Sequence, residues 1–325
     1  MRNQRNLIEV LKFCEPKELL TGCALVCRHW NALSGSDEVW FQAIEDSHTP
    51  IDSVETTAKD YYRVNCRQAF PIVTAKKLFL YSLGSGETKE YRLPTEIEIN
   101  HTSAWAILPG NYVLCAGSEQ SAKAYLLQPP QYSVKSLPDM TQVRGWFAML
   151  HYRGKVYVFG GFYSPWLFTK RCERYELGTE QWKPLPDMSK VRSSFNACRW
   201  KETIFVAGGW QNPEIEYIDL QKDIFHTLSL RMNPTSRTLC WVVGDQLMIV
   251  QQGTIIWWDI ANGCQESTEP VQDQPGPYIW TNAPPMEFQG RLFFLVWEDG
   301  KGYSMDLRTR SVKQVLPNLF DSLYP

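Results

Sequence analysis

Three arginines stand at matching places in consecutive stretches of similar sequence, namely Arg144, Arg192 and Arg237. A guanidinium group is planar, permanently charged and able to hold a carboxylate through two parallel hydrogen bonds. If the fold brings the three together, they form a binding site for acidic groups. The sequence leaves a second interpretation open, in which each arginine ties its own segment of the fold to the neighbouring one.

Aromatic residues also occur in the loops that follow two Gly-Gly pairs, where the two copies of the repeat stop agreeing. The stretch "FYSPWLFTK" carries Tyr163 and Trp166, and the stretch "WQNP" begins with Trp210. Tyrosine, tryptophan and arginine are the residue types that contribute most to the binding energy of protein interfaces. We therefore expect these three aromatic residues, together with the three arginines, to contact a partner protein.

Residue types suited to catalysis or metal binding are present, but their spacing is not. The five histidines are scattered, and none of the nine cysteines forms a C-x-x-C pair. The chain has no G-x-S-x-G, no P-loop and no G-x-G-x-x-G before a helix. We expect reduced cysteines packed as small apolar side chains, no cofactor, no metal and no catalysis. A site assembled from distant segments is the alternative.

Composition restricts the partners and the compartment. The net charge of −2 comes from 33 basic and 35 acidic residues without long runs of one sign. This balance predicts no nucleic-acid or membrane partner. The polar start lacks the apolar core of a secretory signal, and no stretch approaches the roughly 18 apolar residues of a membrane span. We expect a soluble protein of the cytoplasm or the nucleus.

Repeated segments must position these residues. Residues 137–163 return without a gap as residues 185–211, and both copies contain a hydrophobic run that ends in Gly-Gly. With the second glycine of each doublet as the marker, the series continues at intervals of 44 or 48 residues. The markers are Val73, Gly117, Gly161, Gly209, Gly253 and Trp297. A fixed period of this size is typical of solenoids and propellers.

Each unit contains four short β-type segments. In the clearest copy they span residues 146–152, 155–161, 171–177 and 181–186, with Gly, Pro or charged turns between them. Short strands with a turn signal about every 8–12 residues indicate an all-β array. No unit has the spacing of an amphipathic helix, which argues against a helical solenoid.

The doublet Gly160-Gly161, followed by Tyr175 and then Trp182, resembles the signature of the kelch repeat. The resemblance covers roughly residues 70–317 and implies a mainly β fold, a kelch-type β-propeller. It implies that the glycines and the two aromatic residues are structural. It also implies that the three arginines open on the mouth of the central channel.

The first unit lacks an obvious innermost segment, although a propeller must close into a ring. We expect six blades, with the first incomplete or completed from both chain ends. The tail, residues 318–325, is the candidate for the missing strand. Five complete blades plus an open fragment is the alternative.

Residues 7–40 follow a different pattern, in which apolar residues from Glu18 on recur at the spacing of one helix face. A segment this small needs a staple or a partner to bury such a face. The stretch resembles an F-box, most specifically at Val26-Cys27-Arg28-x-Trp30, although Arg2, Asn3 and Arg5 replace the usual Leu-Pro pair and acid. The resemblance implies that it binds a Skp-family adaptor. The residues matched to adaptor binding are Leu7, Val10, Phe13, Pro16, Leu19, Leu20, Val26, Trp30 and Trp40.

The two resemblances together imply three regions: a helical F-box at 1–46, a partly helical linker at 47–69 and the propeller at 70–325. They imply a substrate-recognition subunit of an SCF-type ubiquitin ligase, with the F-box on the adaptor, a cullin held through the adaptor, and a target protein on the propeller. The alternatives are a non-catalytic kelch scaffold, for instance on the cytoskeleton, and a metal-dependent kelch enzyme.

Overall fold

The computed structural model is built from β-strands throughout the part of the chain that it describes. The described residues are 69–83, 85–108, 111–163, 167–209, 212–231, 238–251, 253–271, 284–288, 290–296 and 301–316. The predicted F-box, most of the linker and the tail 318–325 lie outside these residues. The completion of the first blade by the tail therefore stays a prediction.

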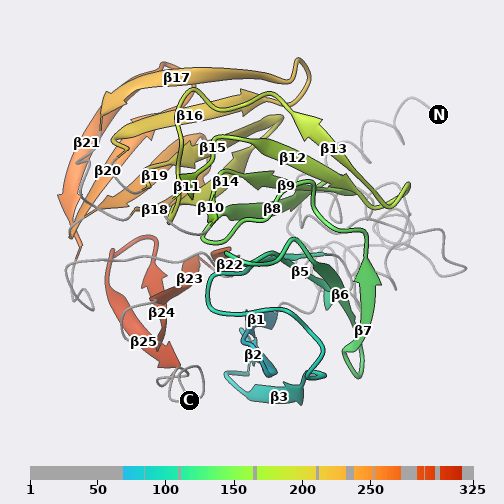
Figure 1. Cartoon of the computed structure of the whole chain (residues 1–325). Coiled ribbons are helices and arrows are strands. Elements are labelled where there is room, and N and C mark those ends of the chain that lie inside the picture. Colours follow the sequence, from blue (N-terminus) through green and yellow to red (C-terminus); the bar gives the residue numbers. More distant parts are fainter. Residues whose placement is uncertain are drawn as a thin grey trace, which may run out of the picture.

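Six antiparallel sheets follow one another around a ring in chain order (Figure 1), so the predicted six-bladed β-propeller is confirmed. Blade 1 has the three strands β1 (Ala69–Val73), β2 (Lys77–Ser82) and β3 (Thr88–Arg92). Blade 2 comprises β4 (Ala104–Ile107), β5 (Val113–Ala116), β6 (Ala124–Gln128) and β7 (Ser133–Leu137). Blade 3 comprises β8 (Ala148–Tyr152), β9 (Lys155–Phe159), β12 (Cys172–Glu176) and β13 (Gln181–Leu185).

The remaining blades repeat the four-stranded order from the centre outward. Blade 4 comprises β14 (Asn196–Trp200), β15 (Thr203–Ala207), β16 (Glu214–Asp219) and β17 (Ile224–Arg231). Blade 5 comprises β18 (Leu239–Val243), β19 (Gln246–Gln251), β20 (Thr254–Asp259) and β21 (Cys264–Pro270). Blade 6 comprises β22 (Met286–Phe288), β23 (Arg291–Val296), β24 (Lys301–Asp306) and β25 (Val312–Leu316).

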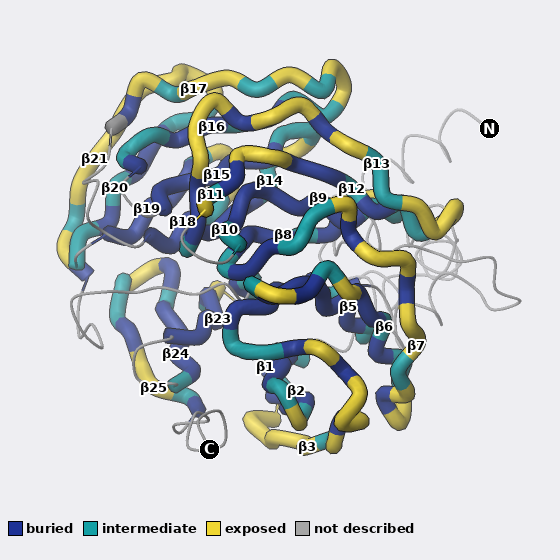
Figure 2. Tube along the Cα trace, viewed as in Figure 1, coloured by how far each residue is buried: buried dark blue, intermediate teal, exposed yellow. Residues whose placement is uncertain are grey.

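The hydrophobic core lies between the blades, because successive side chains of a strand point to opposite faces of its sheet. On β9, Val156 and Val158 pack against blade 2, while Tyr157 and Phe159 pack against blade 4. A strand buried on both faces needs a continuous apolar run, which explains "KVYVF". Outer strands are more polar, and Figure 2 shows β3 and much of β17 as exposed.

The ring is closed by packing between its first and last blades. One core cluster joins Phe70 and Ile72 of blade 1 to Trp105 of blade 2 and to Phe293 and Leu295 of blade 6. The ring of Tyr81 also lies 6.2 Å from that of Phe293, between centroids. Three strands are thus enough to place blade 1 in the circle.

The kelch-signature residues are structural, as predicted. Tyr175 and Trp182 pair across β12 and β13, with ring centroids 5.0 Å apart. The indole N–H of Trp182 donates to the carbonyl of Pro138 in the neighbouring blade (2.8 Å). The phenolic oxygen of Tyr175 is buried, and the ring contributes to the fold by packing in the apolar core between blades 2 and 3.

The first glycine of the doublet is required for close approach between blades. Gly160 has a φ of 59°, and a Cβ there would lie 2.5 Å from the carbonyl oxygen of Arg192. Gly117 has the same surroundings one blade earlier, with the carbonyl oxygen of Arg144 at 2.6 Å from its Cβ position. Gly117 therefore corresponds to the first glycine of the doublet, and the sequence alignment with Gly161 was wrong by one residue.

We expect Gly160→Ala to lower the free energy of unfolding by about 2–4 kcal/mol, because it combines a left-handed backbone with a steric clash. Gly154 is the matched control, since it has a φ of 67° but nothing within 4 Å of its Cβ position. Gly154→Ala should cost only the backbone part, about 1–2 kcal/mol. Urea unfolding of both variants measures the difference. Equal losses would show that the doublet is not a contact between blades.

Within the described residues, no helix has the length and apolarity that a membrane crossing requires.

Candidate functional site

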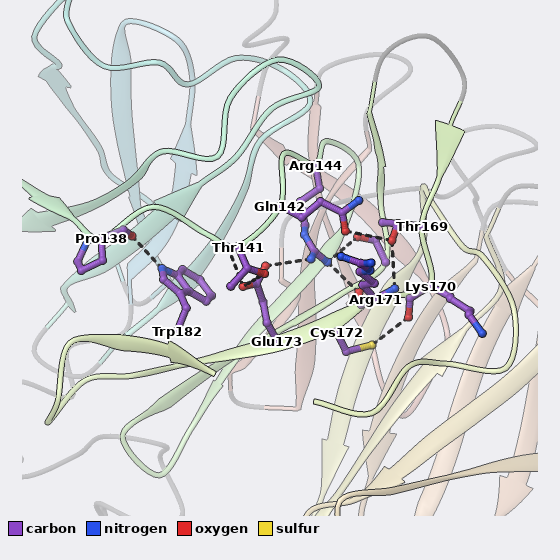
Figure 3. A network of polar contacts seen from close by, with 11 residues as sticks. Pro138, Thr141, Gln142, Arg144, Thr169, Lys170, Arg171, Cys172, Glu173 and Trp182 are labelled. Atoms are coloured by element: carbon purple, nitrogen blue, oxygen red, sulfur yellow. Dashed lines mark hydrogen bonds and ion pairs between the residues drawn. The ribbon is translucent and has the colours of Figure 1, made fainter. Parts of the chain in front are cut away.

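Of the predicted binding residues, Arg144, Arg192 and Tyr163 lie within the described part of the chain, all at the same end of the blades. The segments there lead into the innermost strand of a blade or out of its second strand. Arg144 stands in the loop before β8 and is 0% exposed. Its Nη1 donates to the carbonyl oxygens of Gly160 (2.9 Å) and Arg171 (2.8 Å), and its Nη2 donates to Oε1 of Glu173 (2.9 Å). Figure 3 shows the contact between Arg144 and Glu173 within this network.

Arg192 repeats the arrangement one blade later, also at 0% exposure. Its Nη1 donates to the carbonyl oxygens of Gly208 and Glu214, the latter at 2.7 Å. Its Nη2 donates to Oε1 of Glu216 (2.7 Å) on β16. The two sites are thus built from equivalent parts of blades 3 and 4.

The second oxygen of each glutamate binds the loop that carries the arginine. Oε2 of Glu173 accepts from the backbone N (3.0 Å) and Oγ1 (2.7 Å) of Thr141. Oε2 of Glu216 accepts from the backbone N of Ser189 (2.7 Å). Burial lowers the pKa of Arg144 and Arg192, and the glutamate beside each guanidinium acts in the opposite direction. Each pair therefore satisfies its charges internally and fixes a loop to its own blade.

The expected open position of Arg144 and Arg192 at the channel mouth is wrong, because both side chains are enclosed and hydrogen-bonded within their blades. A carboxylate of another protein would have to displace Glu173 or Glu216 to reach them. The contact between neighbouring blades is made by the backbone, where Gly161 N donates to the carbonyl oxygen of Arg192 (2.7 Å). Arg237 lies outside the described residues.

A small hairpin, which the sequence did not predict, carries the first of the aromatic residues. Strands β10 (Phe162–Tyr163) and β11 (Leu167–Phe168) pair with each other, and Phe162 forms two backbone hydrogen bonds with Gly145, at 2.8 and 2.9 Å. The signal was present as two apolar pairs separated by three residues that include Ser-Pro. Tyr163 is half-buried there, while Trp166 and Trp210 lie outside the described residues.

The exposed residues in and beside this hairpin could not be identified from the sequence, because they are ordinary residue types without a motif. Leu167 is 52% exposed and Val191 is 47% exposed. Lys170, Arg171 and Lys190 are exposed around them. Only exposure in the folded chain distinguishes these side chains from the many others of the same type.

The cysteines carry no reactive site in the part of the chain that the structure describes. Cys115, Cys172, Cys198 and Cys240 are free and buried, as predicted, and only Cys264 is exposed there. Burial raises the pKa of Cys172 to about 12, which leaves the thiol protonated and unreactive. No cluster of three or more His, Cys, Asp or Glu side chains suited to a metal occurs among the described residues.

Comparisons with protein families identify two regions of the chain. A model described as the kelch motif matches residues 147–189, which span β8 to the loop after β13. A model described as F-box-like matches residues 6–44. A comparison with curated proteins found no match. Neither matched model describes a catalytic domain, and proteins that combine these two regions are typically non-catalytic adaptors. With an F-box-like region before a six-bladed propeller that carries a kelch motif, the chain is an F-box/kelch protein.

Proposed function

We propose that the chain is the substrate-recognition subunit of an SCF-type ubiquitin ligase. The observation that carries the proposal is the F-box-like match at residues 6–44 in front of a six-bladed propeller. The F-box binds a Skp-family adaptor and, through it, a cullin. The chain itself performs no catalysis in this role, and it needs no cofactor or metal.

The mechanism is proximity. A propeller that holds a target protein raises the effective concentration of the target's lysines near the ubiquitin-charged enzyme. Rigid blades suit this role, because the loops that contact the target then keep fixed positions relative to one another. The buried Arg–Glu pairs of blades 3 and 4 support such rigidity, since each fixes a loop of the binding face.

The face proposed to bind the target is formed by the loops around the glycine doublets. The proposed contacts are Tyr163, Trp166, Trp210 and Arg237. Arg144 and Arg192 position the loops of this face from below and do not contact the target. Tyr163 is held in place by β11, which pairs with it through Leu167.

Capture of the adaptor tests the proposed function. The full chain should co-precipitate a Skp-family adaptor and a cullin, and Leu19→Arg or Trp30→Ala should lower the captured amount at least about tenfold, as expected for a central interface residue. Lys222→Glu, an exposed residue of the propeller, is the matched control and should leave capture unchanged. A well-folded full chain that captures neither protein would overturn the proposal. Unchanged propeller partners after deletion of residues 1–46, combined with that failure, would indicate a kelch scaffold.

A further inference from the structure

Two exposed apolar side chains lie over the seam between blades 3 and 4. In the part of the chain that the structure describes, only three large hydrophobic side chains are exposed, namely Leu167, Val191 and Ile224. Ile224 begins the outer strand β17, at the opposite end of blade 4 from its Gly-Gly doublet. Leu167 and Val191 are both on the face proposed to bind the target.

Backbone hydrogen bonds join the two segments that carry these residues. Arg192 N donates to the carbonyl oxygen of Thr169 (3.3 Å), so the residue before Arg192 lies beside the segment that follows Leu167. Thr169 N donates in turn to the carbonyl oxygen of Gly161 (2.9 Å). Asn212 Nδ2 donates to the carbonyl oxygen of Val191 (3.4 Å). The apolar pair is therefore presented by hydrogen-bonded loops.

Three exposed cations belong to the same two segments. The side chains of Lys170 and Lys190 are 49% and 54% exposed, and Arg171, which follows Lys170, is exposed as well. Figure 3 shows the Lys170 side chain pointing away from the buried network. We call Leu167, Val191, Lys170, Arg171 and Lys190 the blade 3–4 seam.

The seam has more positive than negative charge on its surface. Lys190 pairs with Glu214 at 2.5 Å, while Lys170 is 4.0 Å from Asp187. Arg171 has no ion-pair partner among the described residues. Its hydrogen bonds there are made by its backbone, whose carbonyl oxygen accepts from Arg144 and Gly160 and whose N–H donates to Oγ1 of Thr169. The long pair between Lys170 and Asp187 is exposed on both sides and therefore weak, so it exchanges readily for another carboxylate. The carboxylates below the seam are already neutralised by the two buried arginines.

We propose that the blade 3–4 seam binds a segment of a partner protein in which apolar side chains are flanked by carboxylates. Leu167 and Val191 contact the apolar side chains, and Lys170, Arg171 and Lys190 bind the acidic ones. An apolar centre with a polar rim is the usual anatomy of a protein interface, and the charge excess selects the sign of the partner. The inference rests on the proposed function in taking a protein as the propeller's ligand.

Nucleic acid fits the seam less well. Nucleic-acid binding draws its affinity from many phosphate contacts, whereas the seam offers three cations, two of which have a carboxylate beside them. The chain as a whole is also slightly acidic, with a net charge of −2. A short acidic and apolar peptide needs only the groups that the seam presents.

Selection from a random-peptide phage library on the immobilised full chain tests the proposal. We expect enriched peptides to carry Asp or Glu beside Leu, Ile, Phe or Met. The affinity of one enriched peptide should fall about tenfold or more in the triple variant Lys170→Glu, Arg171→Glu, Lys190→Glu, because rim charges then repel it. The double variant Leu167→Ser, Val191→Ser should also weaken it. The same triple variant should select basic peptides in place of acidic ones.

The matched control reverses three exposed cations elsewhere on the propeller, through Lys89→Glu, Lys222→Glu and Lys313→Glu. It changes the net charge equally and should leave peptide affinity unchanged, and thermal unfolding checks that all variants are folded. Selection of no peptides, of peptides without an acidic excess, or of peptides that bind both triple variants alike would overturn the proposal. Adaptor capture by the same preparations separates the two ideas. If the chain captures the adaptor but selects no acidic and apolar peptides, only the seam proposal is rejected. If it fails to capture the adaptor but binds peptides through the seam, only the ubiquitin-ligase role is rejected.

Discussion

Replacing Glu173 by glutamine is expected to lower the free energy of unfolding by about 3–5 kcal/mol. The carboxylate is 1% exposed and binds the fully buried guanidinium of Arg144 at 2.9 Å. Its removal leaves a cation in the interior with carbonyl oxygens as its remaining partners. An uncompensated buried charge is among the most destabilising changes that a single substitution can make. Glu216→Gln should have the same effect on blade 4, where Arg192 is equally buried.

Urea unfolding measures this loss, and two comparisons identify its cause. Glu180→Gln removes the partner of Lys135 at a site where the side chains are 51% and 43% exposed, and it should cost at most about 1 kcal/mol. The double variant Arg144→Met, Glu173→Leu removes both charges and should recover much of the stability. A double variant that is no more stable than Glu173→Gln would show that hydrogen-bond geometry, and not the unpaired charge, explains the loss.

The Arg144–Glu173 pair stabilises the fold and also supports the proposed binding face. Arg144 holds the carbonyl oxygen of Arg171, a residue of the blade 3–4 seam, and Glu173 holds Thr141 in the loop before β8. The charges that the sequence offered as direct contacts thus lie under the binding face and fix the loops that carry the exposed residues. In the proposed recognition their role is positional, since the exposed cations Lys170, Arg171 and Lys190 are the ones that face solvent.

Much of the fold could be predicted because the repeat is strongly periodic. The four segments expected in the clearest unit each contain the strand that the structure shows there, for example 155–161 around β9. Turns with Gly or charged residues bound these strands, and the turn chemistry is local. The alignment between units could not be predicted to the residue. The unit of Gly117 has a single glycine where the next unit has a doublet, and only the surroundings of Gly117 in the folded chain show that it matches Gly160.

The burial of the arginines could not be predicted from their own spacing. Arg144 and Glu173 are 29 residues apart, and a motif scan does not join them. The sequence did contain one signal for a buried glutamate. Glu173 stands two residues before Tyr175 and so lies on the same face of β12 as that buried ring. Blade 2 lacks this pair. Gly117 N donates to the carbonyl of Lys123, just as Gly160 N donates to the carbonyl of Arg171, so Lys123 and Arg171 are equivalent. Two residues further on, Tyr125 therefore occupies the place of Glu173. An arginine and a glutamate that occur together in some units, and are both missing in others, indicate an internal pair.

Replacing Trp105 by alanine is expected to loosen blade 1 from the ring and to lower the free energy of unfolding by about 3–5 kcal/mol. Trp105 is on β4 at 2% exposure, in the core cluster that blade 1 shares with blades 2 and 6. Its indole N–H donates to the carbonyl of Pro71 on β1 (3.2 Å). The substitution removes both a large apolar surface and the bond that ties β1 to its neighbour.

Hydrogen exchange shows where the loss occurs. Amides of β1, β2 and β3 should exchange faster in Trp105→Ala, while those of blades 3 to 5 should change little, because local opening exposes only the weakened unit. Trp182→Ala is the matched control, since its indole also donates to a carbonyl of the neighbouring blade but from a half-buried position; it should affect β13 and leave blade 1 unchanged. Trp105→Phe keeps most of the ring area and should cost about 1–2 kcal/mol for the lost hydrogen bond. Faster exchange spread evenly over all six blades would show instead that the propeller opens only as a whole, and that the contact between Trp105 and blade 1 does not hold a separate unit in place.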